Sequence, residues 1–123
     1  SMGAHGALQL GFNYPWVFGV IGAHSPSLRE DDGEIPFLGT GEEWEQRDPI
    51  SLATNAPGIE RLKIWIDLGD EDVYYDRVEQ LKDALEERGI EPEWHVQAGR
   101  DHGWWDYYVE DYIRYYDSAL NPR

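Results

Sequence analysis

Residue types that could share one reaction occur at three separate points of the chain. Ser1 opens the run SMGAHGAL, Asp70 and Asp72 lie in the acidic turn GDED, and Asp101 and His102 lie in the turn GRDHG. A serine hydroxyl is a weak nucleophile until an imidazole takes its proton, and a carboxylate can hold that imidazole in the required tautomer. Read along the chain, the candidates run Ser, then Asp, then His, which suits attack on a carbonyl carbon.

The remaining histidines, His5, His24 and His95, show no convincing metal-ligand spacing, so we expect no metal site and no cofactor. We expect His95 to be packed or surface-facing in the middle of a strand. The chain contains no Cys, which excludes disulfides, a thiolate nucleophile and thiolate metal sites.

Elements in the first half of the chain must position Ser1. Small and apolar residues from Gly3 to about Tyr14 predict a helix that Pro15 ends. The apolar run 17–25 predicts a buried strand. Residues 29–49 are rich in Gly, Pro and acidic residues, and they predict a long surface excursion with a helical turn near 42–46.

Elements in the second half alternate in type. Residues 62–69 predict a strand, 73–88 a helix, 92–98 another strand, and the last helix is predicted to start near Trp104. Gly89 stands where a helix C-cap glycine belongs. The two helices are expected to bury stripes made of Tyr74, Val78, Leu81 and Leu85 in the first, and Trp105, Tyr108, Val109, Tyr112, Ile113, Tyr116 and Leu120 in the second.

Strands that alternate with helices favour right-handed crossovers and a parallel sheet. We therefore expect an α/β fold, a three-layer parallel sheet with flanking helices, formed as a single domain by residues 1–123. Active residues of such sheets gather at the carboxyl ends of the strands. The first strand would leave one edge of the sheet open, which indicates that a preceding segment is missing.

The run SMGAHGAL followed by YPWVFGVIGAHSPSL resembles the nucleophile elbow, helix and next strand of the esterase D-like family of α/β-hydrolases. The resemblance continues in IWIDLGDED, in the RG after the next helix, and in QAGRDHGWWDYYVEDYIRYY. It covers most of residues 1–120, and it implies that the chain is the C-terminal half of an α/β-hydrolase domain.

The resemblance implies a serine esterase that works through an acyl-enzyme, with Ser1 as nucleophile, Asp72 as acid and His102 as base. Asp70 is the main rival for the acid, and Asp67 a distant one. The backbone N–H of Met2 would be one oxyanion-hole donor at the start of the helix. The chain departs from the family at Ala4, where Gly is usual, and it lacks the Gly-x before the nucleophile, the strand that carries it and the second oxyanion loop.

Substrate contacts are expected from His24, at the end of a strand beside the site, and from Trp104 in the aromatic last helix. Tyr107 is a further candidate there. In this family the region corresponding to the acidic excursion often shapes the substrate pocket, which makes Phe37, Leu38 and Trp44 weaker candidates.

An excess of 25 acidic over 10 basic residues gives a formal charge of −15, which disfavours nucleic acid and anionic membranes as partners. A small-molecule or carbohydrate-linked ester is the expected substrate, and the compartment stays open. Two other functions remain: a non-catalytic fragment that pairs its open sheet edge with another copy or a missing N-terminal segment, and a carbohydrate-binding hydrolase-like module. Ser-Met could also be the remainder of a cleaved tag.

Overall fold

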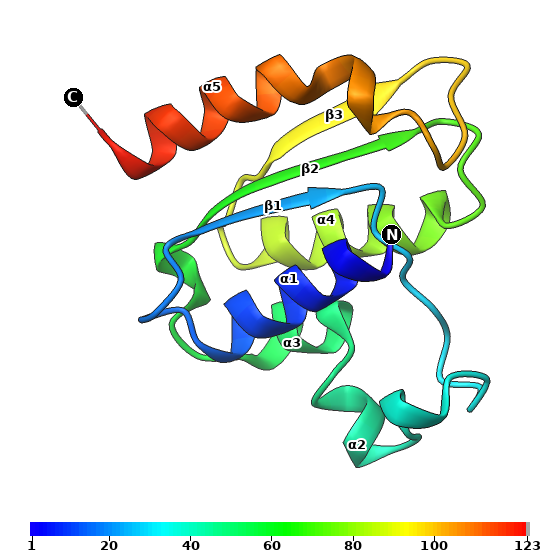
Figure 1. Cartoon of the computed structure of the whole chain (residues 1–123). Helices are drawn as coiled ribbons and strands as arrows, with labels where there is room; N and C mark the ends of the chain where they lie inside the picture. Colours follow the sequence, from blue (N-terminus) through cyan, green and yellow to red (C-terminus); the bar gives the residue numbers. More distant parts are fainter. Residues whose placement is uncertain (123) are drawn as a thin grey trace.

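A parallel sheet of three strands in the order β1-β2-β3 lies at the centre of the computed structural model, which describes residues 1–122 without the Trp105 side chain. The strands are β1 (Val20–His24), β2 (Lys63–Gly69) and β3 (Glu93–Gln97). Figure 1 shows α1, α3 and α4 below the sheet and α5 above it. The predicted α/β class, with a parallel sheet between helical layers, is confirmed.

The lower face of the sheet carries the hydrophobic core. Alternate residues of β1 and β2 are buried there, because successive side chains of a strand point to opposite faces. They pack against α1 (Met2–Asn13), α3 (Pro49–Asn55) and α4 (Tyr75–Glu87). The fully buried members of this core are Leu8, Phe12, Ala23, Ala53, Ile59, Ile66, Leu68, Val78, Leu81 and Leu85.

Helix α4 has the predicted stripe, since Val78, Leu81 and Leu85 are buried and Tyr74 packs against the same core. Gly89 follows the helix with a φ of 75°. Helix α3 was not predicted, because residues 29–49 and the segment after them show no steady apolar period. Asp48 caps it by accepting from the Ser51 N–H, and Pro49 occupies its first turn.

The upper face is covered by α5 (Val109–Leu120), which follows the short helix η3 (Trp105–Tyr108). The predicted apolar stripe of the last helix is wrong in part. Tyr112 is buried, but Val109, Ile113 and Leu120 are exposed, and the Trp105 side chain lies outside the described part. The physical reason is that this sheet face is polar and aromatic, so it pairs with the tyrosines of α5 and not with its aliphatic residues.

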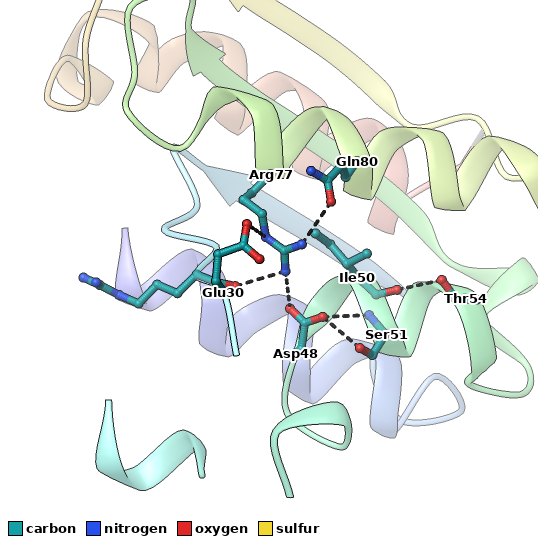
Figure 2. Close-up of polar contacts among 8 residues, drawn as sticks. Glu30, Asp48, Ile50, Ser51, Thr54, Arg77 and Gln80 are labelled. Carbon is teal, nitrogen blue, oxygen red and sulfur yellow. Dashed lines mark hydrogen bonds and ion pairs between the residues drawn. The ribbon is translucent and has the colours of Figure 1, made fainter. Parts of the chain in front are cut away.

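The segment between β1 and β2 also contains η1 (Pro36–Leu38), α2 (Glu42–Glu45) and η2 (Ile59–Arg61). Arg77 of α4 anchors it (Figure 2). The guanidinium donates to the Arg29 carbonyl at 3.0 Å and pairs with the buried Asp48 at 3.5 Å and with Glu30 at 3.7 Å. One side chain thus ties the start and end of the excursion to α4.

Among residues 1–122, no helix has both the length and the apolar character needed to cross a bilayer.

Candidate active site

The carboxyl ends of all three strands lie on the same side of the sheet as the N-terminus (Figure 1). The Ser1 nitrogen donates to the main-chain oxygen of His24, the last residue of β1, at 3.1 Å. The Ser27 N–H donates to the Ser1 oxygen at 3.3 Å. The turn after β1 therefore holds Ser1 by both main-chain polar groups.

Asp72 and His102, which come from the turns after β2 and β3, form a direct pair. His102 Nδ1 lies 2.8 Å from Asp72 Oδ2, and the Tyr74 N–H donates to Asp72 Oδ1 at 2.9 Å. The aspartate side chain is 1% exposed and the imidazole 31%. A carboxylate bound in this way keeps the Nδ1–H tautomer of the imidazole, which makes Nε2 the nitrogen that can take a proton.

Backbone contacts join the two turns that carry this pair. Asp70 Oδ1 accepts from the Gly99 N–H at 2.9 Å, and the Glu71 N–H donates to the Arg100 carbonyl at 2.9 Å. Gly69 ends β2 so close to the next turn that a Cβ there would overlap the Arg100 carbonyl. Asp70, the rival for the acid role, therefore contacts the main chain of the neighbouring turn.

Met2 is the first residue of α1, so its N–H belongs to the helix terminus, where backbone donors have no acceptor within the helix. Its Sδ accepts from Ser27 Oγ at 3.2 Å.

An open cleft of about 520 Å³ lies beside the pair. Its lining residues are Glu71, Val73, Asp101, His102 and Gly103. The imidazole therefore lines a space that could admit a small molecule, although its Nε2 atom is itself covered, and its aspartate partner is shielded from water. A base at a cleft with a buried orienting carboxylate is suited to general acid–base chemistry.

Trp104 and His24, the expected substrate contacts, have other partners in the structure. Trp104 is 2% exposed, and its Nε1 donates to the Asp101 carbonyl at 2.6 Å, so it supports the His102 turn and offers a ligand almost no surface. His24 bonds to Asp67 and Tyr116 on the sheet face that α5 covers.

The weaker candidates differ in exposure. Tyr107 is exposed and lies under the Arg100 guanidinium, 4.7 Å from its Cζ. In the excursion, Phe37 is exposed, Leu38 is buried, and the Trp44 ring lies 5.8 Å from the Arg77 guanidinium carbon. These geometries leave Phe37 and Tyr107 with the most accessible surface.

Sequence reasoning missed three residues near the site. The Tyr74 ring packs edge-on to the His102 imidazole at 5.3 Å, and the Arg29 guanidinium carbon lies 5.6 Å from that tyrosine ring. Ser25 is buried with a φ of 48°, a left-handed conformation that costs a non-glycine residue about 1–3 kcal/mol. Nothing in the sequence pattern indicates the ring contacts, but the Ser-Pro pair after a strand does indicate a sharp turn.

Within the described residues, no group of three or more His, Asp or Glu side chains is placed to hold a metal ion. His5 is buried, and burial lowers the pKa of its imidazole. His95 stacks on Trp65 with ring centroids 3.9 Å apart and pairs with Glu93. Asp67, the distant rival for the acid, is buried beside His24 and not beside His102.

A family model described as "Putative esterase" matches residues 1–121. A search of curated protein sequences found no match. Among solved structures, the chain is similar to an S-formylglutathione hydrolase from Agrobacterium tumefaciens, with a TM-score of 0.80 and 22% identity, covering 98% of this chain and 47% of that one.

Two further structures have the same fold. An S-formylglutathione hydrolase from Staphylococcus aureus gives a TM-score of 0.71 at 18% identity and covers 94% of this chain and 51% of that one. A ferulic acid esterase gives 0.68 at 21% identity and covers 93% and 46%. The chain therefore spans about half the length of the structures it matches.

Proposed function

This chain belongs to the "Putative esterase" family, and from that premise we propose that the protein carrying it hydrolyses carboxylic esters through a Ser1 acyl-enzyme. The observation that carries the proposal is the Asp72–His102 pair, with a buried carboxylate and an imidazole that lines an open cleft. The position of Ser1 on the same side of the sheet supports it.

In the proposed mechanism, His102 Nε2 takes the hydroxyl proton as Ser1 Oγ bonds to the ester carbonyl carbon. Asp72 stabilises the imidazolium, and the Met2 N–H donates to the negative oxygen of the tetrahedral intermediate. The intermediate expels the alcohol, which leaves with the proton from His102. Water then attacks the acyl-enzyme with His102 again as base, releasing the carboxylic acid and restoring the Ser1 hydroxyl.

The test is turnover of p-nitrophenyl acetate by the full-length protein, together with labelling of Ser1 by a fluorophosphonate. We expect S1A or H102A to lower kcat by about 10⁴-fold or more and S1A to abolish labelling. S118A, which changes an exposed serine of α5, is the matched control and should keep wild-type turnover. Wild-type turnover in S1A would refute the proposal.

Substrate choice is a separate question for the same protein. We propose small acyl donors of the two kinds that the similar structures name, a ferulic acid ester and S-formylglutathione. The acidic cleft lining, with Glu71 and Asp101, favours an uncharged substrate over the anionic glutathione group, so of the two we expect the ferulate ester to be the better substrate. Comparing kcat/KM for methyl ferulate and S-formylglutathione would rank them, and turnover of neither would reject both.

A second candidate function is assembly through the sheet edge. Within the described residues β1 pairs with β2 alone, and Val17 and Phe18 before it are exposed. An uncovered edge strand is a template for pairing with another chain. Size-exclusion chromatography of the 123-residue chain tests this: a catalytically silent oligomer would favour assembly, and a monomer would argue against it.

A further inference from the structure

A second histidine–carboxylate pair lies one strand away from the first. His24 and Asp67 are register partners on β1 and β2, with His24 Nδ1 2.9 Å from Asp67 Oδ2. Asp67 is 1% exposed and also accepts from Trp65 Nε1 at 2.8 Å. Both donors meet Oδ2, and the buried Oδ1 has no hydrogen-bond partner among the described residues, so removing either donor would leave a buried carboxylate still less compensated.

Helix α5 covers one side of the His24 imidazole, whose side chain is 21% exposed. Its Nε2 lies 2.8 Å from the Tyr116 hydroxyl, and the Tyr112 ring stacks on it with centroids 3.7 Å apart. Gly22 makes room for this contact, because a Cβ there would overlap the Tyr116 hydroxyl. Both ring nitrogens and one ring face therefore already have partners. This arrangement suits a structural role for the imidazole and not a role in proton transfer.

The main chain of the same two residues reaches the nucleophile. The His24 carbonyl accepts from the Ser1 nitrogen, and the Asp67 carbonyl accepts from the Ser25 N–H at 2.9 Å. Ser25 has the left-handed φ of 48°, which persists only when its surroundings impose it. The Ser27 N–H, two residues on, bonds to the Ser1 oxygen.

We propose that His24 and Asp67 are positioning residues that fix the end of β1 and the Ser25 turn, and thereby hold Ser1 in the position that its reaction with His102 requires. The inference rests on the proposed function. The His24–Asp67 pair fixes the position of the end of β1 relative to β2. The position of the Ser25 turn depends on the end of β1. The end of β1 and this turn bind the Ser1 nitrogen and the Ser1 oxygen. A misplacement of about 1 Å in such a site can cost on the order of 100-fold in rate.

The experiment compares H24L, which removes both ring contacts, with H24N, whose amide N–H can replace the Nδ1–H donor to Asp67. H95L is the matched control, because His95 lies on the same sheet face and stacks on Trp65, but its side chain has no hydrogen bond to Asp67 or to the Ser1 segment in the described part of the chain, so it tests the loss of an imidazole next to the pair. Turnover is measured in the full-length protein, and amide hydrogen exchange is followed at Ser25 and Ser27. Thermal unfolding by circular dichroism confirms that each variant is folded at the assay temperature.

We expect H24L to lower kcat by about 10- to 100-fold with KM within about twofold of wild type, and to speed exchange at Ser25 and Ser27 at least about tenfold. H24N should recover most of both losses, and H95L should change neither. Unchanged exchange at both amides in folded H24L, or equal losses in H24L and H95L, would overturn the proposal.

A second variant covers the case in which H24L does not fold. Y116F keeps the imidazole and removes only the hydroxyl at Nε2, and it should speed exchange at Ser25, whereas no change there would overturn the proposal. Amide hydrogen exchange can be measured without any catalytic activity, so it tests the positioning role of His24 separately from the proposed esterase mechanism. If S1A keeps wild-type activity, the esterase mechanism fails, and the exchange rates still decide whether His24 holds the turn.

Discussion

At the residue scale, the structure separates two aspartates that lie two positions apart in one turn. Asp72 accepts from His102 Nδ1, whereas Asp70 accepts from the Gly99 N–H. In D72N an amide would face Nδ1 and favour the other tautomer, with the proton on Nε2. We expect kcat for p-nitrophenyl acetate to fall about 10⁴-fold in D72N and less than about tenfold in D70N, whose Oδ1 can still accept. Equal losses in the two variants would contradict the assignment of Asp72.

Strand-end positions indicated Ser1, His102 and either Asp70 or Asp72, because the carboxyl ends of parallel strands lie at one edge, and the family resemblance then favoured Asp72. Their roles stay a prediction, although the Asp72–His102 contact is present. The surroundings of these residues could not be predicted. Trp104 is buried and His24 lies under α5, because which aromatic and imidazole groups are enclosed depends on helix packing that a strand-end rule does not specify.

At the element scale, the turns after β2 and β3 can approach each other closely only because Gly69 has no side chain. In G69A the new methyl would displace the Arg100 carbonyl, which precedes His102 by two residues. We expect the free energy of unfolding in urea to fall by about 1–3 kcal/mol and esterase activity to fall with it. G6A in α1, where a Cβ meets nothing within 4 Å, should instead gain about 0.5–1 kcal/mol. A stable, fully active G69A would show that the turns can separate.

The same scale shows why some elements were predictable and others were not. Helix α4 packs an aliphatic stripe on an aliphatic sheet face, so its period is visible in the sequence. Helix α5 packs its tyrosines on a polar sheet face. The helical spacing of Val109, Ile113 and Leu120 predicted that they are buried, but they are exposed. Helix α3 is short, and the Asp48-Pro49 pair that starts it was the available signal.

At the scale of the whole molecule, the formal charge of −15 should make stability rise with salt. Salt screens the repulsion among surface carboxylates, since the Debye length falls from about 10 Å at 0.1 M to about 3 Å at 1 M. It also weakens exposed ion pairs such as Arg114–Glu110, but these contribute at most about 1 kcal/mol each. The buried Arg77–Asp48 pair is screened much less.

Repulsion should therefore prevail, and we expect Tm to rise by several degrees between about 0.01 M and 0.5 M NaCl. The control is the double variant E79K/E87K, which changes two exposed residues of α4 and makes the chain less acidic. Its Tm should start higher and respond less to salt. A Tm that falls as NaCl rises would mean that attraction between the acidic side chains and the 10 basic side chains contributes more to stability than the repulsion among carboxylates.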